Sequence, residues 1–554
     1  MKKLIKSVAL LLALSMIFLL CGCSGGKKNG PFELGANKEI TGEYDESLAA
    51  VTENGVFVGT NEDGADIWRG IPFAKAPVGE LRWKAPQKLD SSDKVYEAYH
   101  YGFKPIQPYA DADDLSEDCL TLNVFTGEDR SVENKPVMVF IHGGAYALEA
   151  TSDEFYLGDY FARQNPDIVF VTIEYRLGIL GYMNFDEVEG GEDYKEAGNL
   201  GLLDQIAALE WIQNNIKAFG GDPDNVTILG ESAGAGSVSL IPVVDGTEDL
   251  YDKIIAMSGG VHFIAPVDER REVTQNIVDI SGADTMDELL ALPEDYIKKN
   301  IEELSTYIPP APVLDGVILP ETEAELYEKW TEATKDKAVI IGSNGNETRY
   351  DLSFWLELPE KYHAQYMEYC YEKVYNMLDP DSKKVFDRVM AEFEGTDSER
   401  WETINRIFDH LGFTTPANYQ AECSSENGQT YMYFFNTPSD TCPLAKSFHS
   451  VELPLLFSNP GCFEITFADN AAVRDMGLVM QEMFVNFAKT GNPSAEGVEW
   501  PVYDANTRST MVFTDDARTE VQNDPNGYMR EIFTPLLKYS RDSMCVYFSY
   551  EGLS

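Results

Sequence analysis

The chain has 554 residues and a formal net charge of −50, with 43 Lys and Arg against 93 Asp and Glu. Such an excess of negative charge repels nucleic acid phosphates and anionic lipid headgroups, which argues against either as a partner of the folded body. Hydrophobic residues make up 44% of the chain, enough for a large core, so the sequence predicts a globular protein and excludes a disordered one.

Residues 1–22 are predicted to be a signal peptide of the lipoprotein type. Three lysines within the first six residues precede Val8–Leu20, an uncharged and mostly apolar run that is shorter than the ~20 residues needed to span a bilayer. The run leads into the sequence Leu-Cys-Gly-Cys, which resembles a bacterial lipobox with Cys23 as the lipidated residue. Cys21 fits less well, because a large residue precedes it. An ordinary cleaved signal peptide is the alternative.

The segment after Cys23 is predicted to be a flexible tether, covering residues 23–41, because it is rich in Gly, Lys and Asn. Residues 42–549 contain no further low-complexity linker and no internal repeat, which predicts one large domain. We therefore expect the protein to lie outside the cytoplasm, with the N-terminal lipid as its only contact with the bacterial cell membrane.

Strand-like runs alternate with a helical pattern in the first half of this domain, which predicts an α/β fold with a large, mostly parallel sheet flanked by helices. The apolar runs cover 137–141, 167–175 and 226–229, and apolar residues recur at helical spacing over 203–219. A long acidic helical stretch over about 353–409 is predicted to be an inserted cap, and strand character returns over 430–435.

Gly230–Gly234 has the pattern G-x-S-x-G, in which a sharp turn lifts the serine above the edge of a sheet. A strand run lies directly before it and a small-residue helix start follows, which favours Ser232 as a nucleophile over a serine in an ordinary glycine-rich turn. His142–Ala145 follows an upstream strand, where glycines let backbone N–H groups point at a developing negative charge. This loop is predicted to contribute to an oxyanion hole.

A histidine base should follow the serine in the chain. Of His363, His410 and His449, the first two fall in the predicted helical cap, whereas His449 follows the predicted strand over 430–435 by a loop. His449 is therefore the favoured base.

An acidic residue that orients this base is expected between the serine and the histidine. Glu347 comes shortly after a predicted strand over 338–341 and is favoured for that reason. Asp315 and Asp351 are competitors that the sequence pattern alone does not exclude.

Several ordered blocks of sequence accompany these candidates. They lie at Trp68–Arg82, Ser116–Asn123, Gly198–Gln205, Phe219–Pro223, the Gly230–Gly234 elbow, Phe487–Pro493 and Trp500–Tyr503. In these blocks, and over nearly the whole chain beyond about Gly42, the sequence resembles the type-B carboxylesterases, the family of carboxylesterases and cholinesterases. The resemblance implies an α/β-hydrolase fold, serine-dependent hydrolysis of small-molecule carboxylic esters through an acyl-enzyme, and no metal or organic cofactor.

The matching positions imply a set of site residues. They are Ser232, Glu347 and His449 as the catalytic triad, Gly144, Ala145 and Ala233 as backbone donors of the oxyanion hole, Glu231 as an acidic pocket residue, and the structural ion pairs Arg82–Glu117 and Arg176–Asp204.

Several positions depart from the family pattern. Ala145 replaces the last glycine of the common HGGG loop, and Thr348 replaces the glycine that usually follows the acid. If the backbone at Thr348 needed a positive φ, a β-branched residue would be strained there, so the turn is expected to take another form. Cys119 has Ile106 about where a disulfide partner would stand, so the first family disulfide should be absent.

A cholinesterase is disfavoured by two further differences. The bulky aromatic residues that narrow the cholinesterase acyl pocket correspond to Thr306 and Ile308. Shortly ahead of Cys119 the nearest aromatic residue is Tyr109, so no tryptophan stands there to stack on a quaternary ammonium. The alternatives to an esterase are an inert binding or adhesion member of the family, or a lipase, thioesterase or amide hydrolase that uses the same triad.

Overall fold

The computed structural model describes residues 34–305, 309–349, 360–393, 399–426 and 428–548. The predicted signal peptide with Cys23, and the candidates Thr306, Ile308 and Asp351, lie outside these ranges. Within them, no helix is both long and apolar enough to cross a bilayer.

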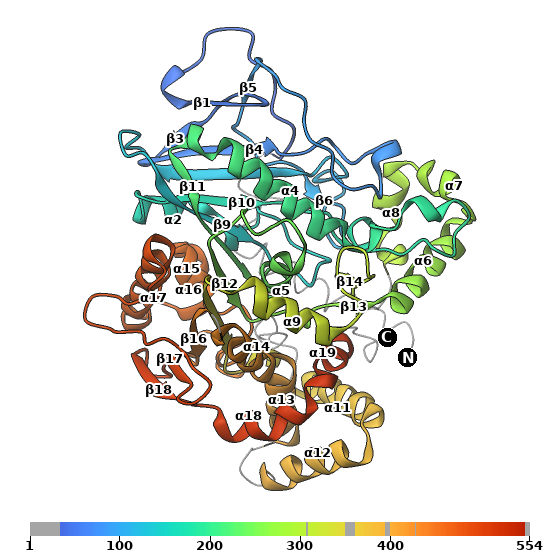
Figure 1. Ribbon diagram of the computed structural model, residues 1–554, viewed down its shortest axis with the longest axis vertical. Helices are drawn as coiled ribbons and strands as arrows, with labels where there is room; N and C mark the ends of the chain where they lie inside the picture. The colour runs from blue at the N-terminus through green and yellow to red at the C-terminus, as the bar shows by residue number, and fades with distance from the viewer. Residues whose placement is uncertain (1–33, 306–308, 350–359, 394–398, 427, 549–554) are drawn as a thin grey trace.

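Eleven of the described strands form one sheet that runs through the centre of the molecule (Figure 1). Its seven consecutive strands from β10 to β17 are parallel, and antiparallel strands complete both edges. In spatial order the strands are β18 (Thr519–Asn523), β17 (Ser509–Phe513), β16 (Gln429–Phe435), β15 (Ala338–Asn344), β12 (Lys253–Met257), β11 (Gly221–Glu231), β9 (Lys135–Ile141), β10 (Val169–Ile173), β8 (Thr121–Gly127), β4 (Ala65–Pro72) and β3 (Thr60–Glu62).

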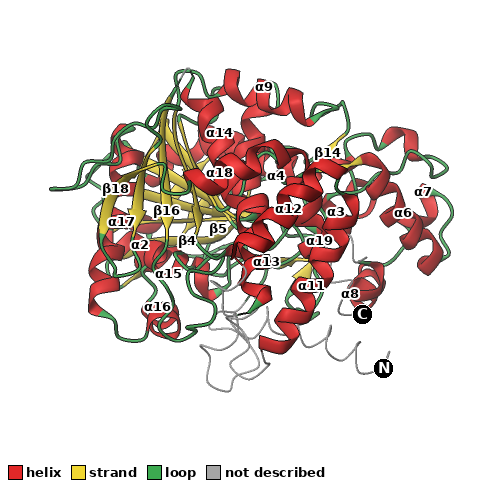
Figure 2. Ribbon diagram, turned by 90° about the horizontal axis from the view of Figure 1, so that it is seen from below, coloured by secondary structure: helices red, strands yellow, loops and turns green. Residues whose placement is uncertain are grey.

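The central strands are buried on both faces, as their unbroken apolar runs predict. Every residue of β10 and β12 is buried. Helices lie on both sides of the sheet in Figure 2, among them α2 (Gly158–Gln164), α4 (Leu200–Asn215), α14 (Thr415–Ser425) and α17 (Ala471–Thr490). Each of these helices packs on at least one strand of the sheet. Because the strands are parallel, their carboxyl ends meet at one edge, where loops can bring side chains together.

A helical insertion separates β15 from β16 and lies at the lower end of the view in Figure 1. The cap predicted over 353–409 falls largely on it, and the helices continue further, to Ser425. The insertion comprises α11 (Glu360–Met377), α12 (Pro380–Phe393), α13 (Arg400–Asp409), a π-helical turn (His410–Thr414) and α14.

The predicted tether over 23–41 is too long at its C-terminal end. Asn37 donates hydrogen bonds from Nδ2 to the carbonyl oxygens of Arg69 (2.7 Å) and Gly70 (3.1 Å), and its Oδ1 accepts one from the Tyr99 N–H (3.1 Å). The Ile40 N–H also donates to a carbonyl of the folded body. The polar composition of this segment suggests a flexible chain, but the Asn37 side chain forms hydrogen bonds with several backbone groups. Residues from Leu34 onward therefore belong to the folded body.

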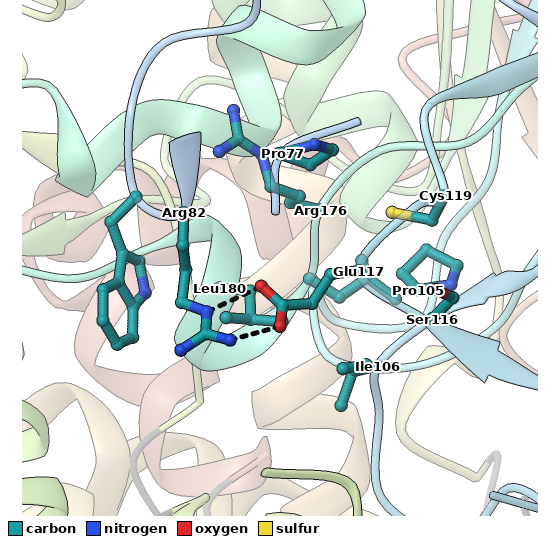
Figure 3. Close-up of a pocket in the computed structure, with 11 residues that line it drawn as sticks. Pro77, Arg82, Pro105, Ile106, Ser116, Glu117, Cys119, Arg176 and Leu180 are labelled. Atoms are coloured by element: carbon teal, nitrogen blue, oxygen red, sulfur yellow. Dashed lines mark hydrogen bonds and ion pairs between the residues drawn. The ribbon is translucent and has the colours of Figure 1, made fainter. Parts of the chain in front are cut away.

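Both ion pairs that the family resemblance implies are present. Arg82 Nη2 lies 2.5 Å from Glu117 Oε1 (Figure 3), and Arg176 Nη2 lies 2.7 Å from Asp204 Oδ1. Cys119 is a free, buried thiol, and Ile106 lines the same small cavity. Burial raises the pKa of the Cys119 thiol well above its usual range, which keeps it protonated and chemically inert.

Candidate active site

The structure brings the sequence-predicted residues to one edge of the sheet, at the carboxyl ends of four parallel strands. The loop with Gly144 follows β9, Ser232 follows β11, Glu347 stands three residues after β15, and His449 lies in the loop after β16. Ser232, Glu347 and His449 are all buried. Asp315, by contrast, accepts hydrogen bonds from Asn199 and from backbone N–H groups of its own turn.

The turn at Ser232 has a backbone conformation that is costly for a residue with a side chain. Ser232 joins β11 to α5 (Ala233–Leu240) with φ 57° and ψ −120°. A Cβ atom at Gly234 would lie 2.0 Å from the Ile141 carbonyl oxygen, and one at Gly230 would lie 2.3 Å from the Gly234 oxygen. Only glycine fits at either position, so the two glycines of the motif permit the strained serine between them.

The loop after β9 lies against this turn. A Cβ atom at Gly143 would come within 3.1 Å of Ser232 Cβ. Gly144, Ala145 and Tyr146 then have three consecutive positive φ angles, of 81°, 53° and 58°. Among the described residues no acceptor takes a hydrogen bond from the N–H of Gly144 or Ala145. Ala233, the first residue of α5, has no acceptor for its N–H within the helix.

His449 and Glu347 are directly hydrogen-bonded. The Nδ1–H of His449 donates to Glu347 Oε2 at 2.6 Å, and Glu347 Oε1 accepts from the Asn344 N–H at 2.6 Å. The other two candidate histidines are engaged elsewhere, since His363 Nε2 lies 2.8 Å from Asn405 Oδ1 and the His410 ring stacks on Phe533.

Two further buried carboxylates surround this pair. Glu231 Oε1 lies 3.3 Å from His449 Nε2 and accepts a hydrogen bond from Ser450 Oγ (2.7 Å). Glu452 Oε2 accepts one from Asn344 Nδ2 (2.5 Å). Burial raises the pKa of both carboxyl groups. Burial also lowers the pKa of His449, but the negative charges of Glu231 and Glu347 outweigh that effect and raise it to about 9.

The turn that carries Glu347 has no positive φ at Thr348, as expected from the β-branched residue at that position. Thr348 has φ −82° and ψ 17°, so the β-branched residue is not strained there. Its N–H and hydroxyl both donate to Asp409, a residue that no sequence motif singles out. Ser450 and Asn344 were missed for the same reason. The departure from glycine at Thr348 was the signal in the sequence that pointed to a polar partner such as Asp409.

Among the described residues, no three His, Cys, Asp or Glu side chains come together in a group that could hold a metal ion. Two of the carboxylates of the site are instead engaged in hydrogen bonds, Glu347 with His449 and Glu231 with Ser450.

Comparison with known proteins decides the family. The model of the carboxylesterase family matches residues 46–529. The chain belongs to the carboxylesterase family. It is 33% identical over 504 residues to the para-nitrobenzyl esterase of Bacillus subtilis, an alignment that covers 87% of this chain and 98% of the relative. It is 30% identical over 490 residues to carboxylesterase 1C of Mus musculus, which covers 80% of this chain and 84% of the relative.

A solved structure of PNB esterase has the same architecture as this carboxylesterase. It superimposes with a TM-score of 0.74 at 31% sequence identity, covering 88% of this chain and 100% of the other. The predicted α/β-hydrolase fold is confirmed. The carboxylesterase is a serine-dependent hydrolase of carboxylic esters, as the sequence also predicted, and its substrates are small-molecule esters.

Proposed function

We propose that Ser232, His449 and Glu347 are the catalytic triad of this carboxylesterase. Ser232 Oγ attacks the ester carbonyl carbon while His449 removes its proton, and Glu347 stabilises the resulting imidazolium. The tetrahedral oxyanion accepts hydrogen bonds from the N–H groups of Gly144, Ala145 and Ala233. His449 then returns the proton to the departing alcohol. A water molecule, deprotonated by His449, attacks the acyl-enzyme and releases the acid.

The observation that carries this proposal is the 2.6 Å hydrogen bond between His449 Nδ1 and Glu347 Oε2 at the same sheet edge as the strained Ser232. It fixes which imidazole nitrogen carries a proton and leaves Nε2 as the basic one. The N–H groups of Gly144 and Ala145 support the assignment, because a negatively charged oxygen would satisfy them.

The first experiment replaces the nucleophile. Ser232→Ala should lower the kcat for p-nitrophenyl acetate by about 10⁴-fold or more, because no acyl-enzyme can form. Ser237→Ala is the matched control, since Ser237 is also buried and lies close by in the sequence, within α5. Circular dichroism should show that both variants are folded. Activity of Ser232→Ala above a tenth of the wild-type value would refute the assignment.

A second experiment tests the acid. Glu347→Gln should lower kcat by roughly 10³- to 10⁴-fold, because an amide cannot stabilise the imidazolium. Asp315→Asn and Asp351→Asn should leave kcat within about twofold of the wild type if neither is the orienting acid. A large loss in either control would move the assignment away from Glu347.

We also propose that the mature protein is extracytoplasmic and is anchored to the bacterial cell membrane by a lipid on Cys23. The lipobox-like sequence that ends the apolar N-terminal run supports this proposal. Mass spectrometry of the mature N-terminus should find a lipidated Cys23, and Cys23→Ser should move the protein out of the membrane fraction or leave it unprocessed. A mature chain that begins elsewhere without a lipid would contradict the proposal.

A further inference from the structure

The turn that carries Glu347 is fastened to the helical insertion by a group of short hydrogen bonds. Thr348 donates to Asp409 Oδ1 from both its N–H (2.7 Å) and its Oγ1 (2.6 Å). Asn405 Nδ2 donates to the Thr348 carbonyl oxygen and to its Oγ1, each at 2.8 Å. All three residues are buried, so water does not compete for these bonds.

The partners on the insertion lie on one face of α13. Glu402, Asn405 and Asp409 are spaced by three and four residues, which places their side chains on the same side of a helix. Glu402 Oε1 lies 3.4 Å from Arg349 Nη2, so the next residue of the turn is held by this face as well. The turn therefore lies along α13 over two consecutive residues.

A second helix of the insertion fixes the orientation of Asn405. Asn405 Oδ1 lies 2.8 Å from His363 Nε2 on α11, and the imidazole N–H can donate to it. Because the amide oxygen is occupied there, the two amide hydrogens point toward Thr348. The chain of hydrogen bonds thus runs from α11 through α13 to the turn.

On its other side, Glu347 is held by the end of β15 and by His449, through the Asn344 N–H and through Nδ1 of the imidazole. Two attachments therefore determine where the Glu347 carboxylate sits: the strand on one side and α13 on the other. A turn released from α13 could carry the carboxylate away from His449, and misplacement by about 1 Å is enough to cost roughly 10²-fold in rate.

We propose that Asn405 and Asp409 of the insertion are positioning residues that hold Glu347 against His449. This inference rests on the proposed role of Glu347 as the acid of the triad. The Thr348 hydroxyl strengthens the attachment, because a glycine at that position would offer Asp409 only a backbone N–H.

The test compares two variants of Asp409 that both lose the negative charge but differ in whether they keep an acceptor oxygen for Thr348. Asp409→Asn retains an acceptor oxygen for Thr348, and its kcat should stay within about threefold of the wild type. Asp409→Leu removes the acceptor, and its kcat should fall by roughly ten- to a hundredfold with KM changed less than about threefold. Thr348→Val, which loses only the hydroxyl bonds, should lower kcat by about three- to tenfold.

A stability control distinguishes positioning from general damage to the helix. Ile407→Ala empties a buried apolar position on α13 without removing any of the hydrogen bonds to the turn. Its melting temperature should fall at least as far as that of Thr348→Val while kcat stays unchanged. Equal losses of kcat in the two variants would overturn the inference.

A double-mutant cycle shows whether the effect passes through Glu347. In a Glu347→Gln background, Asp409→Leu and Thr348→Val should cause no further loss of kcat, because there is no carboxylate left to position. The same fold-losses in both backgrounds would overturn the inference. If Glu347→Gln itself retained full activity, the proposed triad would fail first, so the two failures can be told apart.

Discussion

Ser232 stands on a strained backbone that the glycines two residues away on either side permit, whereas Glu347 stands on a turn with ordinary dihedral angles that side chains hold in place. In the first region close approach of main chains defines the geometry, and the strain is local. In the second region the geometry depends on Asp409 and Asn405, about 60 residues further along the chain. Substitutions should therefore act differently in the two regions. In the first, a single added methyl group should cause a large loss of stability and activity, and in the second, loss of one hydrogen bond should cause a smaller loss.

The largest effect is expected where a side chain cannot be accommodated at all. Gly234→Ala would place a Cβ atom 2.0 Å from the Ile141 carbonyl oxygen, so β9 and α5 would have to separate. We expect a loss of about 4 kcal/mol or more in the free energy of unfolding, or no soluble protein, together with loss of esterase activity. Urea denaturation measures the change.

Gly42→Ala provides the control for this variant. No atom lies within 4 Å of a Cβ atom at Gly42, so the free energy of unfolding should change by less than about 0.5 kcal/mol. If Gly234→Ala were as stable as Gly42→Ala, the close packing between the elbow and β9 would not be what defines the site.

Glycine at position 348 should destabilise the acid turn. Thr348→Gly removes the hydrogen bonds of the hydroxyl with Asp409 and Asn405 and adds backbone freedom to the unfolded chain, while the native φ of −82° gains nothing from glycine. We expect the free energy of unfolding to fall by about 1–3 kcal/mol. Unchanged stability would mean that the attachment to α13 contributes little.

Glycine at position 145 should have the opposite effect. Ala145 adopts a φ of 53°, so Ala145→Gly relieves a left-handed conformation that costs an alanine roughly 1–2 kcal/mol. After the entropy cost of glycine, we expect a gain of about 0.5–1 kcal/mol in the free energy of unfolding, with activity retained. A loss of stability at both positions would remove the contrast between the two regions.

The smallest effect concerns the charge that links the two regions. The Glu231 carboxylate raises the pKa of His449, so Glu231→Gln should lower it. Because His449 must be unprotonated to act as a base, the acid limb of the pH profile of kcat/KM should move to lower pH, by about one unit or less. The exposed Glu46→Gln should leave the limb in place. A shift to higher pH would contradict this reading of the site.

The contrast also explains what the sequence could predict. Gly230–Gly234 and the loop at Gly144 are local patterns whose spacing is set by steric contact, so they can be recognised from the sequence alone. The strand before each of them is also recognisable, because it is an apolar run. Asp409 and Asn405 belong to no such pattern, because their contact with Thr348 forms only when α13 packs against the turn. The positive φ of Ala145 was equally invisible, since alanine itself disfavours it. The tether boundary failed because Asn37 acts through contacts distant in sequence.

The order of strands in the sheet has a consequence for how the chain is assembled during synthesis. From β11 onward each described strand of the sheet lies on the edge left by the preceding one, through β12, β15, β16 and β17 to β18. During synthesis each new strand of the sheet can therefore pair with the strand of the sheet that was made just before it. A chain that stops after β12 or β15 would expose a row of unpaired N–H and C=O groups on an apolar strand, which is a template for aggregation. The finished sheet ends instead on β18, a short and partly exposed strand that contains Glu520 and Gln522.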